Sequence, residues 1–92
     1  MDFEIKQDAE KNRFVTYVEE YEAVVEYTLK DNVIDLYRTF TPPELRGKGV
    51  AGKLVKYALE HAKENNLKVI TTCSYVRGYI ERHENYKELL SE

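Results

Sequence analysis

Two hydrophobic periodicities divide this chain, and they meet at Pro42 and Pro43. Before the prolines, apolar and polar residues alternate in short runs, which is typical of β-strands with one buried face. The runs lie around Phe3 and Ile5, then at Arg13–Glu19, Ala23–Leu29 and Val33–Phe40. Because the breaks between them are short, we expect an antiparallel meander, with a turn at Lys30–Asn32.

After the prolines, apolar residues recur at the spacing of an amphipathic helix. The stripe comprises Val50, Leu54, Val55, Ala58, Leu59 and Ala62, and it predicts a helix over about Gly49–Asn65. A short β-branched strand is expected at Lys68–Thr72. A second helix should start near Ser74, with Ser74 or Cys73 close to its cap, and run to about His83, and a last helical turn should cover Asn85–Leu90.

These elements predict one α/β domain over residues 1–92 in the order β-β-β-β-α-β-α. Strand four, the first helix and strand five form a crossover, which would be right-handed and would make those two strands parallel. The expected fold class is therefore an antiparallel meander with one parallel β-α-β crossover at strands four and five. A chain of 92 residues supports one modest core.

Composition narrows the function classes. With 17 acidic and 14 basic residues, the chain lacks a global electrostatic footprint for nucleic acid. No apolar run approaches transmembrane length, and the acidic start lacks the features of a signal peptide, so we expect a cytoplasmic protein with no membrane partner. The single cysteine, Cys73, excludes an internal disulfide and a multi-cysteine zinc site, and we expect no metal.

The segment Arg46–Gly52, which reads Arg-Gly-Lys-Gly-Val-Ala-Gly, lies between strand four and the first helix. A helix N-terminus offers unpaired N–H groups and partial positive charge, which favour phosphate oxygens. Glycines let the backbone approach a ligand closely, and Arg46 and Lys48 add positive charge. The spacing matches neither a Walker A loop nor the Rossmann fingerprint. The alternative is a tight strand-to-helix turn with a solvated basic edge.

Arg46, Gly49 and Ala51 fit the Arg/Gln-x-x-Gly-x-Gly/Ala motif, so this segment resembles the GCN5-related N-acetyltransferases. The resemblance implies acetyl-CoA (coenzyme A) as cofactor, with its pyrophosphate on this loop and its pantetheine arm in a gap where strands four and five splay apart. The implied binding residues are Arg46, Gly47, Lys48, Gly49, Val50, Ala51 and Gly52.

A second resemblance lies downstream, where Thr72–Val76, Tyr79-Ile80 and Asn85-Tyr86 look like the C-terminal half of the smallest, stand-alone members of that superfamily. Together the two motifs cover roughly Val33–Leu90. Most members carry helices between the first two strands, and these help to build the acceptor site. Gln7–Asn12 is too short for them, so the resemblance supports the nucleotide half of the site and leaves the acceptor unidentified.

Cys73 is the first candidate catalytic residue. It follows a strand and precedes a helix, where a thiol can have a lowered pKa. In the resemblance it faces the thioester of acetyl-CoA, and a covalent acetyl-cysteine is chemically accessible because thiol–thioester exchange is nearly isoenergetic. The alternative is a small packing residue, since free cysteine is among the most often buried types.

The partners expected around Cys73 are incomplete. Small relatives tend to carry a His-Thr pair where this sequence has Arg38-Thr39, and arginine cannot act as a general base. Arg38 could stabilise a thiolate, bind an acidic acceptor, or pair with Glu44 or Asp35. The family often uses a tyrosine to protonate the departing CoA thiolate. Tyr79 and Tyr86 are the candidates, although core packing is the commoner use of tyrosine.

Two histidines complete the titratable groups of interest. His61 is expected on the flank of the first helix. His83 is expected at the end of the second helix, where histidine commonly bonds free carbonyl groups. We assign neither a catalytic role.

Three functions therefore remain open. The first is an acetyl-CoA-dependent acyltransferase that acts on an unknown amine, with Cys73 near the thioester. The second is a non-catalytic CoA-binding or interaction module. The third is an interaction domain without a ligand, in which the glycine loop is only a turn.

Overall fold

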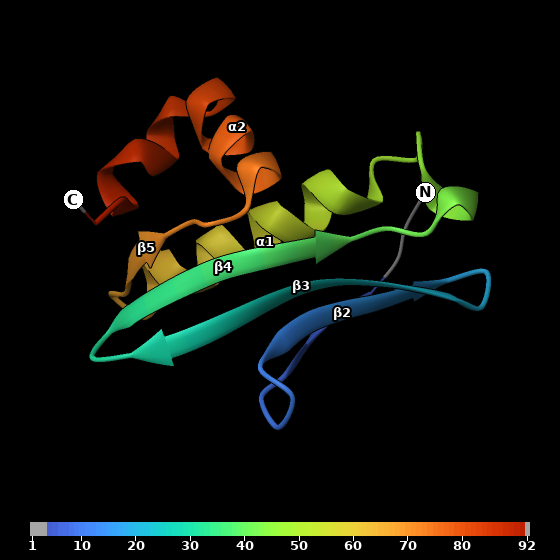
Figure 1. The fold of residues 1–92 in the computed structure, drawn as a ribbon, viewed down its shortest axis with the longest axis horizontal. Helices are drawn as coiled ribbons and strands as arrows, with labels where there is room; N and C mark the ends of the chain where they lie inside the picture. Colours follow the sequence, from blue (N-terminus) through green and yellow to red (C-terminus); the bar gives the residue numbers. More distant parts are fainter. Residues whose placement is uncertain (1–3, 92) are drawn as a thin grey trace.

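The computed structural model describes residues 4–91 as one five-stranded sheet with helices on one face and beyond one edge (Figure 1). The strands are β1 (Ile5–Asp8), β2 (Arg13–Val18), β3 (Tyr21–Lys30), β4 (Val33–Phe40) and β5 (Lys68–Ile70). The helices are α1 (Val50–Glu64) and α2 (Ser74–Arg82), with 3-10 turns η1 (Pro43–Leu45) and η2 (Glu84–Leu89). Phe3, which we expected in the first strand, lies outside the described residues.

The strands lie in the sheet in their sequence order. Each of β1 to β4 pairs antiparallel with the next, while β4 and β5 pair parallel. The predicted meander with one parallel crossover is therefore confirmed. Within residues 4–91, no helix precedes β4, because the short connections leave room only for turns.

Tight hairpins set the register of the sheet. Asp31 and Asn32 have φ of 52° and 66°, and Glu19 and Glu20 have φ of 53° and 72°. Two successive left-handed residues match the twist of the flanking strands. Asp and Asn tolerate this backbone, as the sequence predicted for Lys30–Asn32, whereas the glutamates show that the hairpin geometry overrides residue preference.

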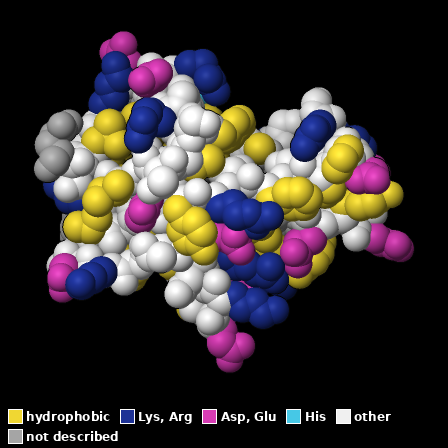
Figure 2. Space-filling model, viewed as in Figure 1, with side chains coloured by type: hydrophobic (Ala, Val, Ile, Leu, Met, Phe, Trp, Pro, Cys, Tyr) yellow, Lys and Arg dark blue, Asp and Glu magenta, His cyan; other side chains and the backbone are white. Residues whose placement is uncertain are grey.

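The core lies between the sheet and α1. Every residue of the predicted helical stripe is buried, and the least buried of them, Val50, exposes only 1% of its surface. From the sheet, Phe14, Val25 and Leu36 are fully buried against the same core. The opposite face carries ion pairs, in which Arg13 contacts Asp8 and Glu22. Figure 2 shows acidic and basic side chains interspersed on the surface in view, without a field of one sign.

The fold positions the site at the point where β4 and β5 part. The two strands pair only from Val33 with Lys68 to Asp35 with Ile70, and β4 then continues to Phe40 beside β3 alone. Strand five therefore ends at Ile70 and not at Thr72 as predicted. The reason is that the N–H of Thr72 donates to the Asp35 carboxylate at 3.2 Å and so leaves the ladder.

Smaller differences concern the helix ends. Gly49 is the N-cap of α1, with a left-handed φ of 76°, and Asn65 is the C-cap. Cys73 caps α2, whose last residue is Arg82. The closing turn is a 3-10 helix from Glu84. Backbone geometry at each cap, and not the apolar spacing, decides these boundaries.

Candidate functional site

The glycine loop presents a helix start without side-chain caps. Gly47 and Gly49 have φ of 83° and 76°, a left-handed backbone that glycine adopts without steric cost. Among the residues that the structure describes, no side chain caps α1, and the first turn of this helix contains no acidic residue. The N–H groups of this turn therefore face outward without a competing carboxylate, as an anion site at a helix N-terminus requires.

The turn before α1 uses some of its backbone amides internally. The N–H groups of Arg46 and Lys48 donate to the carbonyls of Pro43 and Leu45 at 3.2 and 3.3 Å. Within residues 4–91, the amides of Gly47 and Gly49 have no backbone acceptor. Hydrogen bonds from the Arg46 and Lys48 amides thus stabilise the loop, and the amides of Gly47 and Gly49 remain available to a ligand.

Both cations of the loop already contact the protein. The Lys48 ammonium lies 3.2 Å from the carboxylate of Glu19, which belongs to the β2–β3 hairpin turn. The Arg46 guanidinium donates to the carbonyl of Thr41 at 3.4 Å. An anion bound here must therefore compete with Glu19 for Lys48. The sequence did not reveal this pair, because 29 positions separate the two residues.

Two adjoining hollows lie along the loop. The first, of about 210 Å³, is lined by the predicted segment except Lys48, together with Thr41, Leu45 and Tyr75. The second, of about 250 Å³, is lined by Thr39, Thr41, Arg46, Ala51 and Tyr75. Because they share Thr41, Arg46, Ala51 and Tyr75, they form one groove from the start of α1 to Thr39 on β4.

Thr41 carries a polar atom without a partner. Its hydroxyl oxygen is buried and has no hydrogen bond within the described residues. An unsatisfied buried hydroxyl is costly, so such an atom beside a groove is well suited to a polar ligand. Thr41 and Tyr75 were both missed by sequence reasoning. The orphaned hydroxyl becomes evident only once the sheet and helices surround it.

At the far end of the groove, β4 meets the start of α2. The Thr39 hydroxyl lies 3.5 Å from the Cys73 thiol, across the gap where the strands have parted. The gap is also bridged by Thr71, whose hydroxyl donates to the carbonyls of Leu36 and Cys73. Side chains therefore replace the missing ladder and hold the thiol in place.

The environment of Cys73 favours its thiolate. Partial burial raises the pKa of this thiol, but the hydrogen bond with Thr39 and the backbone N–H groups of Val76 and Tyr75 lower it more, so that the net pKa falls below its ordinary value. Backbone amides at a helix N-terminus stabilise an anion in this way. Cys73 thus lies before a helix as predicted, but beyond the end of β5 at Ile70, and it remains partly accessible.

Arg38 is not paired as expected. Its guanidinium lies 2.8 Å from Glu26 on the neighbouring strand and above the ring of Phe40. Pairing with Glu44 or Asp35, one of the alternatives considered for Arg38, is not found, and Asp35 instead binds Thr72. Successive strand residues point to opposite faces. Arg38 therefore lies on the open face of the sheet, while Thr39 faces the thiol.

The two tyrosine candidates differ in their surroundings. Tyr79 is 8% exposed, and its ring stacks on His83 with centroids 4.0 Å apart. Burial and the neighbouring Tyr75 raise the pKa of Tyr79, which keeps its hydroxyl protonated. Tyr86 donates to Glu60 at 2.5 Å, and burial with this bond raises its pKa to about 12. Neither tyrosine lines the groove, whereas Tyr75 does.

The histidines lie away from the thiol. The Nδ1 atom of His83 is 2.8 Å from the carbonyl of Tyr79, at the end of α2, as predicted for a C-terminal histidine. His61 packs edge-on against Phe14. In residues 4–91, no group of three or more His, Cys, Asp or Glu side chains is arranged to hold a metal ion. The helices described there are too short or too polar to cross a membrane.

Comparison with known proteins agrees with this geometry. A proposed GCN5-like N-acetyltransferase from Staphylococcus aureus, solved by NMR, superimposes with a TM-score of 0.75 at 36% identity, covering 96% of this chain and 87% of that one. Human protein NATD1 is 38% identical over 51 residues, which are 55% of this chain and 45% of the relative. The Xenopus tropicalis protein is 38% identical over 58 residues, or 63% of this chain and 52% of the relative.

The aligned segment spans about half the length of these NATD1 relatives. The family match is longer, since residues 13–89 match GCN5-related N-acetyl-transferase. This range includes β2 to β5, the glycine loop and Cys73. The chain therefore belongs to the GCN5-related N-acetyltransferase family.

Proposed function

We propose that this protein binds acetyl-CoA along the groove and transfers its acetyl group to an amine, with the pyrophosphate on Arg46–Gly52 and the thioester beside Cys73. One observation carries the proposal: the groove runs from the glycine loop to Thr39, which contacts the thiol. Family membership supports acetyl-CoA-dependent acyl transfer in general. That the acceptor is an amine and that Cys73 takes part in the transfer go beyond what family membership supports, and both are proposed here.

The loop suits a pyrophosphate on three counts. The glycine amides have no backbone acceptor, the first turn of α1 lacks a carboxylate, and two cations lie alongside. Gly47 and Gly49 also leave open space, since an added Cβ would meet nothing within 4 Å. Phosphate oxygens can therefore approach the backbone closely, and Arg46 and Lys48 supply charge-assisted contacts.

The middle of the groove suits the polar arm of CoA. The Thr41 hydroxyl needs a partner, and an amide of the pantetheine arm offers both a donor and an acceptor. Beyond Thr41, the strands have separated, and Thr39 and Cys73 lie on opposite sides of the gap. The thioester would then come to lie at a thiol with lowered pKa.

The chemistry follows from that thiol. The Cys73 thiolate attacks the thioester carbonyl carbon, a new S–C bond forms, and the bond to the CoA sulfur breaks. The departing CoA sulfur takes a proton from the hydroxyl of Tyr79, which lies outside the residues that line the groove and would have to approach the sulfur, and it leaves as free CoA. An amine then attacks the acetyl-cysteine, which releases the amide and the Cys73 thiolate, and the proton lost by the amine returns to the Tyr79 oxygen. Because position 38 carries an arginine bound to Glu26, no general base is supplied there, and we expect slow transfer.

A second candidate is a CoA-binding module without turnover. It is favoured by the ion pair that holds Arg38 on the open face, and by the turn at Ala9–Asn12, where most relatives carry helices that help to form the acceptor site. In that case Cys73 would accept an acetyl group and keep it, or would only contact the thioester.

Intact-mass analysis after incubation with acetyl-CoA at mildly alkaline pH distinguishes these functions, with Cys73→Ala as the control. A thioester at Cys73 that is passed to an added amine supports the enzyme. A thioester that forms and stays supports the module. Acetylation of lysines alone, unchanged in Cys73→Ala, would leave Cys73 a packing residue and would contradict the covalent route.

A further inference from the structure

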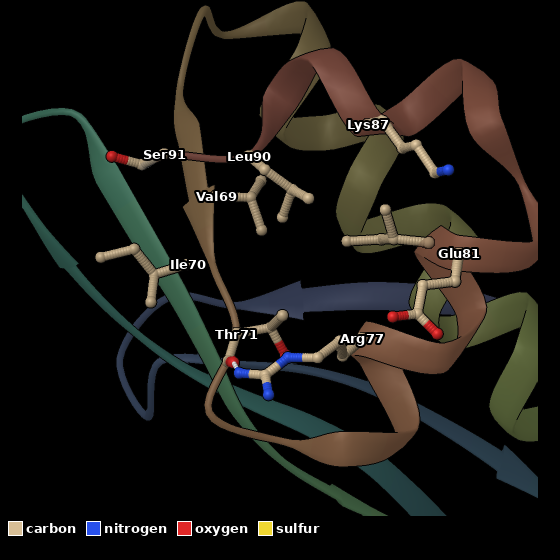
Figure 3. Close-up of a pocket in the computed structure, with 9 residues that line it drawn as sticks. Val69, Ile70, Thr71, Arg77, Glu81, Lys87, Leu90 and Ser91 are labelled. Atoms are coloured by element: carbon tan, nitrogen blue, oxygen red, sulfur yellow. Dashed lines mark hydrogen bonds between the residues drawn. The ribbon is translucent and has the colours of Figure 1, made fainter.

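A further hollow lies away from the groove. It has a volume of about 550 Å³ and opens between β5, α2 and the C-terminal segment (Figure 3). None of its lining residues lines the two hollows at the glycine loop. Its size falls in the range of small-molecule sites, which is about 300–1,000 Å³. Nothing in the proposed transfer of an acetyl group uses it.

The floor of this hollow is aliphatic. Val69 of β5 and Ile80 of α2 are buried at its base, and Leu90 of the C-terminal segment is partly exposed beside them. The C-terminal segment is held there because the N–H of Ser91 donates to the carbonyl of Val69 at 2.8 Å. A branched apolar side chain would find matching contacts on this floor.

Opposite charges line the hollow without neutralising each other. Arg77 and Glu81 are four residues apart on α2, a spacing at which such residues commonly pair. They do not pair here, because the Arg77 guanidinium donates to the carbonyl of Thr71 at 2.8 Å. Within residues 4–91, the Glu81 carboxylate has no ion pair. Arg77 is thus anchored at one side, and Glu81 remains available at the other.

A second cation, Lys87 of η2, also lines the hollow. Its only ion pair within the described residues is a long one, 3.9 Å to Glu84, between two exposed side chains. Such a pair contributes little and is readily exchanged. The hollow therefore combines two basic groups, one free carboxylate and an apolar floor.

We propose that this hollow binds a free α-amino acid with an aliphatic side chain. The ligand's carboxylate would contact Arg77, its ammonium group would contact Glu81, and its side chain would pack on Val69, Ile80 and Leu90 (Figure 3). A guanidinium recognises a carboxylate with paired, directional hydrogen bonds. A ligand with both charges satisfies Glu81 and Arg77 together, whereas an ion of one sign leaves one of these two groups without a partner.

Calorimetric titration of the protein with L-leucine is the test. Leucinamide, which lacks the carboxylate, and N-acetylleucine, which lacks the ammonium group, are the matched probes. We expect leucine to bind at least about tenfold more tightly than either, because each loses charge-assisted hydrogen bonds. Equal affinity for leucine and leucinamide, or no binding of leucine, would overturn the proposal.

Glu81→Gln keeps the size of the side chain and removes its charge, so it should weaken leucine binding about tenfold. Glu10→Gln, the same change in the β1–β2 turn, should leave the affinity unchanged. Equal loss in both variants, or none in Glu81→Gln, would contradict the assignment. Leucine is titrated without CoA, so failure of this site and failure of the acetyl-CoA groove are separate results.

Discussion

The hydroxyl of Thr39, on β4, lies 3.5 Å from the thiol of Cys73, at the start of α2, although 34 positions separate the two residues. This contact is formed where β4 and β5 no longer pair, so it joins the two sides of the gap. It also contributes to the lowered pKa of Cys73. The position of the thiol and its reactivity therefore depend on the same residue.

Thr39→Val should raise the pKa of Cys73, because it removes a donor that stabilises the thiolate. We would follow the rate of Cys73 alkylation by iodoacetamide against pH. In Thr39→Val its midpoint should lie at higher pH than in wild type, and its value at neutral pH should be lower by up to about threefold. Thr28→Val, at an exposed position on β3, is the matched control. An unchanged midpoint in Thr39→Val would show that the helix amides alone set the pKa.

The same shift predicts a direction for stability. The folded-state pKa of Cys73 lies below that of the unfolded chain. The thiolate therefore contributes stability that is present above the unfolded pKa and is lost as pH falls through the folded pKa. Urea unfolding of wild type and Cys73→Ala across this range should show the difference. A constant difference between the two proteins at all pH values would argue against a shifted thiol.

Gly49→Asn should abolish most CoA binding while preserving the fold. Asparagine tolerates the left-handed φ of 76° at this position, and its side chain would occupy the space proposed for phosphate. We expect at least about tenfold weaker binding by calorimetry. Gly49→Val should lose binding as well, with added backbone strain.

Gly78→Ala on α2 controls for the loss of a glycine. Its added Cβ would meet only the flexible end of Arg82, at 3.4 Å. CoA binding should stay unchanged in this variant. Equal affinity in wild type and both Gly49 variants would place CoA elsewhere on the protein.

Glu19→Gln should strengthen CoA binding, because it frees Lys48 from an exposed ion pair. Surface pairs of this kind are worth up to about 1 kcal/mol, so the affinity should rise by up to about fivefold. The gain should shrink as salt increases, since salt screens the interaction. Glu20→Gln, in the same turn, is the control, and an equal gain there would point to net charge and not to Lys48.

Tyr86→Phe should destabilise the fold. Tyr86 is 2% exposed, and its hydroxyl ties η2 to α1 through Glu60 at 2.5 Å. A hydrogen bond to a charged group contributes about 1.5–3 kcal/mol, so urea unfolding should show a loss near that range. Tyr17→Phe removes a similar bond to Glu22 at a 60% exposed position and should cost less than about 0.5 kcal/mol.

The bond also predicts alkaline behaviour. The pKa of Tyr86 is raised to about 12, above its ordinary value of about 10. The stability that it contributes is present in full below the unfolded pKa and is lost as pH rises from about 10 to about 12. Wild type and Tyr86→Phe should therefore converge in stability over this interval. If the free energies of unfolding of the two proteins still differed at high pH, the loss in Tyr86→Phe would be due to packing and not to the hydrogen bond.

Much of the fold follows from patterns that are local in sequence. Alternation before Pro42 and the stripe on α1 predicted the strands and the main helix, because one face of each must be buried. The sequence also predicted the left-handed turn at Asp31-Asn32 and the position of Cys73 before α2. These features depend on residue chemistry and on the order of the elements.

The details of the site could not be predicted from the sequence in the same way. Arg38 pairs with Glu26, and strand five ends where Asp35 binds Thr72. The bulge in the register between β3 and β4 falls at Glu26 and Tyr27 and shifts the cross-strand partners of β4. A shift of one residue changes every cross-strand neighbour beyond it, so no local pattern could predict these pairs.

Sequence by itself thus determined the order of the elements, the face that each buries, and the two segments with a chemical signature, Arg46–Gly52 and Cys73. Only the tertiary structure decided that Lys48 meets Glu19, that Thr39 meets Cys73, and that the Thr41 hydroxyl has no hydrogen-bond partner among the described residues. The physical reason is that burial and backbone preference act along the chain, whereas these contacts depend on strand register and on where two strands stop pairing.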